Sequence, residues 1–111
     1  MGNKLYQGRN IYMLRHIVMW KYKEGLTDAE NEMNAEKIKN GLEALKNSID
    51  EIVEIKVNIN ALSTSNMDIV LDSLFESEKA MATYKIHPEH KKMSEFISSV
   101  LQNRTVIDYY E

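Results

Sequence analysis

A segment rich in β-branched and aromatic residues begins the regular part of the chain, over residues 13–23 (MLRHIVMWKYK). This composition predicts a β-strand. Successive side chains of a strand point to opposite faces, so His16, Val18 and Trp20 would share one face and Ile17 would lie on the other. Apolar groups occupy both faces near the centre of the strand, which indicates burial on both sides.

A capping box follows this strand. Thr27 and Glu30 have the three-residue spacing of this motif, which predicts the start of a helix. The helix would run to about Asn47. Apolar positions three and four residues apart give it a single stripe, made of Ala35, Ile38, Leu42, Leu45 and Ile49. Gly41 weakens the helix by roughly 1 kcal/mol relative to Ala, and we expect it to let the helix approach the sheet closely.

Two alternating segments predict a β-hairpin. Residues 52–60 (IVEIKVNIN) place Val and Ile on one face and Glu, Lys and Asn on the other, and residues 67–76 alternate in a similar way. The small polar segment ALSTSN between them is typical of a turn. We therefore expect two antiparallel strands here.

Pro88 divides the second helical region. Ser77 would cap a short helix over residues 78–85. Pro88 lacks a backbone N–H, so it would end that helix and open a new one at its first position. The apolar stripe of the new helix would consist of Met93, Phe96, Ile97, Val100 and Leu101. Residues 104–110 (RTVIDYY) predict a last strand.

The predicted order of strand, helix, strand, strand, helix, strand is that of a ferredoxin-like α+β fold. Two helices can cover only one face of a four-stranded sheet. Because the first strand carries apolar groups on its second face as well, we expect that face to pack on the same face of another copy. Such two-fold packing gives a homodimer.

The composition fits one ordinary globular domain of 111 residues. The formal net charge is -3 without a long basic run, which disfavours nucleic acid as a partner. The absence of cysteine excludes disulfides and thiolate chemistry. No apolar run reaches the ~20 residues of a membrane span, and no secretory signal is recognisable, so we expect a cytoplasmic protein without a membrane partner.

Residues 1–12 lack a clear period and are interpreted as an N-terminal extension of a domain over residues 13–111.

The segment ATYKIHPEHKKM, residues 82–93, brings two of the three histidines close to a tyrosine. His90 would lie in the first turn of the helix that begins at Pro88, where the positive end of the helix dipole lowers the pKa of a histidine. A neutral imidazole can act as a general base, and Tyr84 could hold an enolate oxygen. His16 would join them if its face of the strand looks toward the helices.

Structural roles compete with this interpretation. A His-Pro pair at a helix start is often a capping device, with the ring bonded to the backbone. His16 could be a hydrogen-bonded core histidine, and Tyr84 could pack its ring while exposing its hydroxyl.

If the three side chains converge, we expect an apolar pocket whose wall includes Val18, Trp20, Leu71, Met93 and Val106. No metal or cofactor is expected. His87, Glu89 and His90 do not match a zinc spacing, no Gly-rich phosphate loop is present, and one histidine on a helix does not establish a haem site.

Three stretches resemble the stress-responsive dimeric α/β-barrel (Dabb) family: LRHIVMWKYKEG, DIVLDSLFESEKAMATYKIHPEHKKMSEFI and RTVIDYYE. The resemblance covers residues 13–111, and its most specific part is the HPxH element with an upstream tyrosine and the closing Val-Ile-Asp-Tyr strand. It implies a ferredoxin-like subunit whose sheet pairs with that of a second copy to form a barrel.

A plant member of this family, olivetolic acid cyclase, cyclises a polyketide in a pocket between helices and sheet. The resemblance places its catalytic tyrosine and histidine at Tyr84 and His90, and its strand histidine at His16. Several bulky pocket residues of that enzyme correspond to Lys91, Met93 and Ser94 here, which changes the shape and polarity of the pocket. The resemblance therefore implies which positions line the pocket, but it does not identify the substrate.

Three hypotheses about function follow. The first is a protein with a small-molecule pocket that acts as a cofactor-free acid–base enzyme, with His90 as general base, Tyr84 as oxyanion donor and His16 as an orienting group. The second is a non-enzymatic, stress-associated protein that acts through its dimer or a higher assembly. The third is a haem- or oxygen-dependent relative of dimeric α/β-barrel oxygenases.

Overall fold

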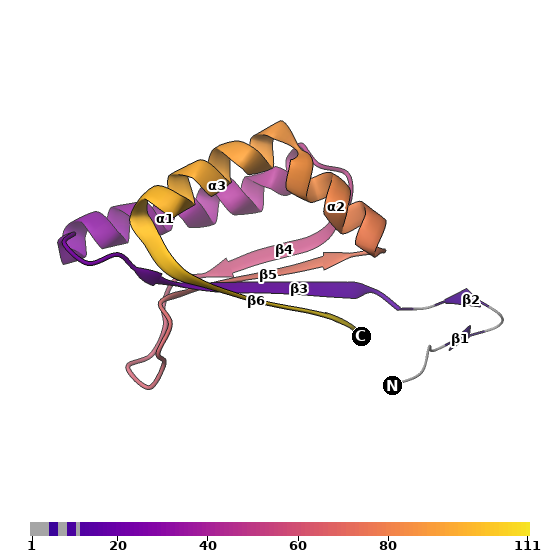
Figure 1. Cartoon of the computed structure of the whole chain (residues 1–111), viewed down its shortest axis with the longest axis horizontal. Helices are drawn as coiled ribbons and strands as arrows, with labels where there is room; N and C mark the ends of the chain where they lie inside the picture. Colours follow the sequence, from indigo (N-terminus) through magenta and orange to yellow (C-terminus); the bar gives the residue numbers. More distant parts are fainter. Residues whose placement is uncertain (1–4, 7–8, 11) are drawn as a thin grey trace.

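The structure, a computed structural model, describes residues 5–6, 9–10 and 12–111 (Figure 1). Two short strands at the start, Leu5–Tyr6 (β1) and Arg9–Asn10 (β2), pair antiparallel. Most of the predicted extension over residues 1–12 lies outside the described residues, so its boundary with the domain stays a prediction.

A four-stranded antiparallel sheet forms the body of the molecule, in the order β4-β5-β3-β6. Its strands are β3 (Leu14–Tyr22), β4 (Ile52–Asn58), β5 (Ile69–Phe75) and β6 (Leu101–Tyr110). The first strand of the sheet along the chain, β3, pairs with both β5 and β6 and so lies inside it. This order confirms the predicted ferredoxin-like arrangement and the predicted hairpin of β4 with β5.

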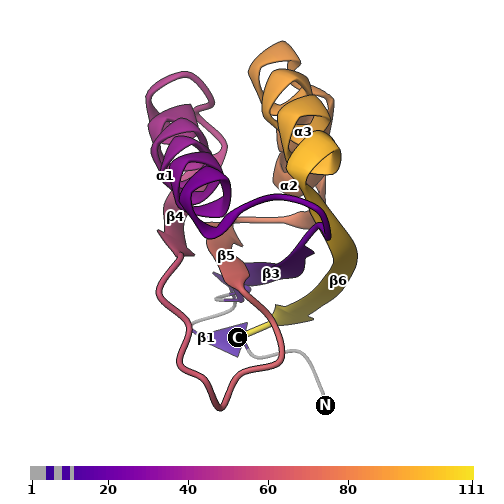
Figure 2. The ribbon, with the colours of Figure 1, turned by 90° about the vertical axis from the view of Figure 1, so that its left-hand side faces the viewer.

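The α-helices of the described chain, three in number, cover the same face of the sheet (Figures 1 and 2). They are α1 (Asp28–Ala44), which continues into a 3-10 turn (η1, Leu45–Asn47), α2 (Glu78–Ile86) and α3 (Pro88–Val100). The loop between β4 and β5 extends to the opposite side of the sheet. The other face of the sheet is therefore left open; we call it the open face.

The helix boundaries follow from local hydrogen bonds that the sequence predicts. The Glu30 N–H donates to the Thr27 hydroxyl at 3.1 Å and the Thr27 N–H donates to Glu30 Oε1 at 2.9 Å, which completes the predicted capping box. The Ala80 N–H donates to the Ser77 hydroxyl at 3.1 Å and so caps α2. Pro88 opens α3, as predicted. No helix in the described part of the chain is long and apolar enough to cross a bilayer.

The hydrophobic core lies between the helices and the covered face of the sheet. The whole predicted stripe of the first helix is buried there, namely Ala35, Ile38, Leu42, Leu45 and Ile49. It packs with buried residues of the strands such as Val18, Val57 and Phe75. Burial of this apolar area is the main source of stability for a fold of this size.

Gly41 lies against a helix rather than against the sheet. A Cβ atom on Gly41 would come within 2.5 Å of the Met93 Sδ atom on α3. The expectation that Gly41 lets its helix approach the sheet was therefore wrong. The missing side chain instead makes room for Met93 between α1 and α3.

The last strand begins at Leu101 rather than at residue 104. Leu101 pairs with Tyr22 and so belongs to β6, not to the apolar stripe of α3. A register shift opposite Trp20 interrupts the pairing of β6 with β3, and Asn103 beside it has a φ of 57°. These two features mark a β-bulge with its first residue in the left-handed region, which Asn tolerates better than most residues.

Candidate functional site

A small cavity of about 60 Å³ lies between the helices and the covered face of the sheet. Its apolar lining consists of Val18, Trp20, Leu42, Leu71 and Ile97. Its polar lining consists of His16, Tyr84, His90, Ser94, Ser98 and Arg104. At this size the cavity has room for only a small chemical group, since ligand pockets usually measure roughly 300–1,000 Å³.

Four elements supply the polar side chains, and their periodicities place them together. His16 lies on the covered face of β3, and Tyr84 is near the end of α2. His90, Ser94 and Ser98 are four residues apart on α3 and therefore share one helix face. Arg104 comes from β6. The structure thus brings together the three side chains that the sequence singled out as chemical candidates.

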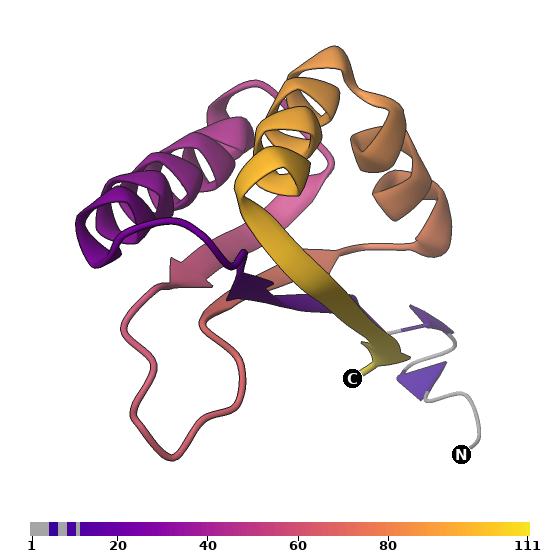
Figure 3. The same ribbon diagram turned by 60° about the vertical axis from the view of Figure 1, so that its left-hand side comes forward.

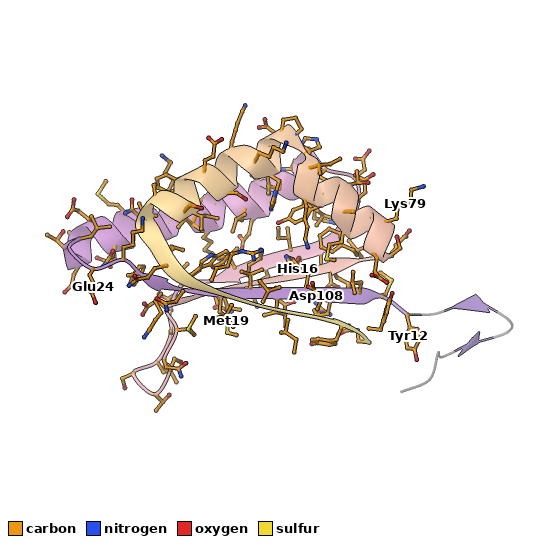
Figure 4. All side chains as sticks on the ribbon, in the orientation of Figure 1. Tyr12, His16, Met19, Glu24, Lys79 and Asp108 are labelled. Atoms are coloured by element: carbon orange, nitrogen blue, oxygen red, sulfur yellow. The ribbon has the colours of Figure 1, made fainter. Side chains whose placement is uncertain are left out.

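His16 is buried and hydrogen-bonded to Asp108 (Figure 4). The two residues lie directly opposite each other in the register of β3 and β6. The distance from His16 Nδ1 to Asp108 Oδ1 is 2.5 Å. Because the carboxylate can only accept, Nδ1 carries the proton and the lone pair lies on Nε2. Burial lowers the pKa of His16 and outweighs the opposing effect of Asp108.

His90 has the same tautomer for a different reason. Its Nδ1 lies 3.0 Å from the backbone carbonyl oxygen of Lys85, so Nδ1–H donates and Nε2 is left with its lone pair. The pKa of His90 is lowered chiefly by burial. The lowered pKa agrees with the prediction from sequence, but its cause is burial and the nearby positive charges rather than a helix dipole alone.

Tyr84 is fully buried between the two histidines. Its ring centroid lies 6.4 Å from that of His16 and 4.4 Å from that of His90. Its hydroxyl is buried but has no hydrogen-bond partner among the described residues. A buried, unpaired polar group costs about 1–3 kcal/mol. Burial also raises the pKa of Tyr84, so the phenol stays protonated and can donate to a bound oxyanion.

His87 has the structural role that a His-Pro pair suggests. Its Nδ1 accepts a hydrogen bond from the Glu89 N–H at 3.1 Å and caps the N-terminus of α3. The two histidines of the HPxH element therefore divide: His87 caps a helix, and His90 lines the cavity.

The predicted pocket wall is found in part. Val18, Trp20 and Leu71 line the cavity, whereas Met93 and Val106 are not among its described lining residues. Met93 is turned toward Gly41 and packs between the helices. Val106 lies on β6 opposite Val18 and is 37% exposed.

Sequence reasoning missed Asp108 and Arg104. Asp108 lies within the RTVIDYY strand, and alternation puts it on one face with Val106, but its contact with His16 depends on the register of two strands distant in sequence. Alternation puts Arg104 on the same face, two residues before Val106, but its contact with the cavity depends on how β6 packs against the helices. Ser94 and Ser98 were noticed only as serines near His90, and the spacing of α3 explains why they line the cavity.

A larger hollow of about 460 Å³ lies elsewhere, on the open side of the sheet. It is formed by the loop between β4 and β5 together with Met19 and Val70. Its single titratable side chain, Asp68, already accepts a hydrogen bond from the Tyr22 N–H at 2.8 Å. Nowhere in the described ranges do three or more His, Cys, Asp or Glu residues come close enough to hold a metal ion. The smaller cavity is therefore the better candidate for chemistry.

Comparisons with known proteins identify the family. A dimeric ferredoxin-like protein from Bacteroides fragilis is 27% identical, with a TM-score of 0.84 over 89% of this chain and 96% of that one. A dimeric ferredoxin-like protein from Thermobifida fusca is 21% identical, with a TM-score of 0.76 over the whole of both chains. A hydroxynitrile lyase from Passiflora edulis is 18% identical, with a TM-score of 0.74 over 89% of this chain and 93% of that one.

The search of curated proteins found no match. The family model of the stress responsive A/B barrel domain matches residues 14–111, nearly the whole range over which the sequence resembles that family. The chain belongs to the stress responsive A/B barrel domain family.

Proposed function

We propose that this chain is a cofactor-free acid–base enzyme that acts on a small carbonyl compound in the cavity between the helices and the sheet. One observation carries the proposal. Two buried or half-buried imidazoles and one buried phenol surround the same cavity, and neither the Nε2 atoms nor the phenol has a partner within the described part of the chain. Titratable groups whose pKa values are shifted by burial gather at functional sites more often than elsewhere.

The chemistry assigns a separate task to each side chain. His90 Nε2 takes a proton from the carbon next to the carbonyl, the C–H bond breaks, and its electron pair moves onto the carbonyl oxygen. Tyr84 donates a hydrogen bond from its hydroxyl to that oxygen. The same bond gives the buried hydroxyl the partner that it otherwise lacks among the described residues. The proton then returns from His90 to the substrate. General bases of this kind contribute about 10²–10⁴-fold in rate.

His16 acts as the orienting group of this arrangement. The hydrogen bond to Asp108 fixes its ring and its tautomer, in the way that a carboxylate orients a histidine in many active sites. Its Nε2 can then accept a hydrogen bond from a substrate hydroxyl. The Passiflora edulis lyase has the same fold, so the fold is compatible with an enzyme, but the proposal rests on the residues of this cavity.

A thermal-shift screen of small ketones, keto acids and phenols tests the proposal. A compound at about 100 times its dissociation constant stabilises the folded state by roughly 2.7 kcal/mol, a shift of several degrees. We expect such a compound to stabilise the wild type and to lose most of its effect in His90→Ala.

His87→Ala is the matched control, because it removes the neighbouring histidine and the cap of α3 but no group of the cavity. It should melt at a lower temperature and respond to the compound like the wild type. Equal responses of the wild type and His90→Ala to every compound that binds would contradict the proposal.

We also propose that the functional unit is a homodimer built on the open face of the sheet. Ile107 is 54% and Tyr109 41% exposed on that face, beside the partly buried Ile17. Both bacterial relatives described above are dimeric. If assembly alone were the function, the melting temperature would depend on protein concentration and no compound would bind. A monomer at micromolar concentrations in light scattering would contradict the dimer.

A further inference from the structure

We infer that the substrate of this cavity carries a carboxylate that pairs with the guanidinium of Arg104. The inference rests on the proposed function, because it names the substrate class of the same site. Arg104 is the one cationic side chain among the described residues that line the cavity, and His16, Tyr84 and His90 line it too.

Alternation along β6 brings Arg104 to this position, because it lies two residues before Val106. Val106 pairs with Val18 and Leu101 with Tyr22, so both lie on the covered face. Strict alternation cannot put Leu101 and Arg104 on one face, since they are three residues apart. The bulge at Asn103, with its φ of 57°, supplies the extra residue that lets Leu101 face the helices as well. Bulges often redirect a side chain beside an active site.

The charge of Arg104 is unbalanced within the described structure. Arg15, on the open face, bonds to Asp72 at 2.9 Å and to Glu111 at 2.7 and 3.0 Å. By contrast, the guanidinium of Arg104 has no hydrogen-bond or ion-pair partner among the described residues. Burial of the two rings is the largest effect that lowers the pKa values of His16 and His90. The positive charge of Arg104 is among the smaller effects in the same direction. An anion bound to Arg104 would offset this field at the cavity.

A carboxylate fits these surroundings better than a phosphate. The guanidinium presents paired N–H donors that match the two oxygens of a carboxylate. Half of the remaining lining residues are apolar, including Trp20 and Leu71, and the cavity is small. Phosphate sites commonly use free N–H groups at a helix N-terminus, but at α3 the Glu89 N–H already bonds to His87.

Matched acids and amides test the inference without knowledge of the natural substrate. Pyruvate and pyruvamide, and levulinate and levulinamide, are titrated into the wild type and followed by amide-proton NMR shifts. We expect each acid to bind the wild type at least tenfold more tightly than its amide. In Arg104→Gln the acid should bind no more tightly than the amide, and Arg104→Lys should recover part of the difference because it keeps the charge.

Lys79→Gln is the charge-matched control, since Lys79 is exposed on α2 and is not among the residues that line the cavity. It should leave the preference for acids intact. Equal binding of acid and amide to the wild type, no binding of either acid, or an unchanged preference in Arg104→Gln would overturn the inference. So would equally tight binding of inorganic phosphate that depends on Arg104.

His90→Gln separates this inference from the proposed function. A variant that still prefers acids but no longer catalyses proton exchange supports both. If neutral ketones bind and react in a His90-dependent way while acids show no advantage, the carboxylate inference fails and the proposed function stands. If acids bind through Arg104 and no compound reacts, the proposed function fails and the binding inference stands.

Discussion

The two faces of the sheet carry different kinds of polar group, although one strand contributes to both. On the covered face of β3, His16 lies beside a cavity with an unpaired phenol and an unpaired guanidinium nearby. On the open face, one residue away, Arg15 is held by Asp72 and Glu111. Figure 3 shows how the helices enclose the first face and leave the second bare.

The difference indicates that the open face suits an interface and the covered face suits a binding site. Satisfied ion pairs and apolar side chains suit an interface, where unpaired charge is costly. Polar groups without protein partners suit a binding site, where a ligand completes them. Because alternation separates the two faces, each should be alterable without loss of the other.

Ile107→Asp should have the largest effect, on the open face. An uncompensated charge buried in an interface costs roughly 3–5 kcal/mol, so the dimer dissociation constant should rise by about a hundredfold or more. Light scattering at micromolar concentration would show a monomer. Ile86→Asp is the control, because Ile86 is 69% exposed on α2, and its mass should stay that of the dimer. Dimeric Ile107→Asp would show that this face is not the interface.

Phe75→Ala should act on the covered face alone. Phe75 is fully buried, and its ring lies 4.9 Å from that of Tyr84 and 6.3 Å from that of His16. Removing it should lower the free energy of unfolding by about 3–5 kcal/mol and weaken ligand binding. Urea denaturation measures this loss. The difference in free energy of unfolding between the variant and the wild type should be the same at every protein concentration. A loss that grows on dilution would mean that the two faces are coupled.

The histidines of the cavity should make stability depend on pH. Burial lowers the folded-state pKa values of His16 and His90 below the value near 6.5 of an unfolded chain. The unfolded state then binds more protons, so the stabilising effect is complete above about pH 6.5 and is lost as the pH falls toward the folded-state values.

The slope cannot exceed about 1.4 kcal/mol per pH unit for each histidine. Urea denaturation between pH 5 and 8 measures it for the wild type, His16→Gln and His87→Gln. The slope should flatten in His16→Gln and persist in His87→Gln. An identical slope in His16→Gln would mean that His16 does not titrate in this way.

Thr27→Ala should have the smallest effect and should leave both faces unchanged. Loss of the N-cap of α1 should cost about 1 kcal/mol. The variant should melt at a slightly lower temperature, with the dimer mass and the ligand-induced shift of the wild type. If either changed, stability in general rather than a specific face would explain the results of the other variants.

The sequence predicted the elements well because their signals are local. The capping box at Thr27, the stripe of α1, the hairpin and the break at Pro88 each depend on residues a few positions apart, and the structure has all of them. His16, Tyr84 and His90 could be proposed because strand and helix periods, together with the family resemblance, put them on facing surfaces.

Features that depend on register or on packing between distant segments could not be predicted. The contact of His16 with Asp108 needs the pairing of two strands that brings together residues 92 positions apart. The approach of Met93 to Gly41 needs the mutual placement of α1 and α3, and it removes Met93 from the predicted wall. The bulge at Asn103 shifts the alternation of β6 by a residue and so puts Leu101 on the covered face.

Proton exchange at the carbon next to a carbonyl group tests the central claim most directly. Pyruvate, levulinate and their amides are incubated in D2O with the wild type, His90→Gln or Tyr84→Phe, and loss of the proton signal is followed by NMR. The wild type should accelerate exchange of a compound that it binds, His90→Gln should lose about 10²-fold or more of this acceleration, and Tyr84→Phe should lose a similar amount. Exchange at the buffer rate with every bound compound, or an undiminished rate in His90→Gln, would contradict the account.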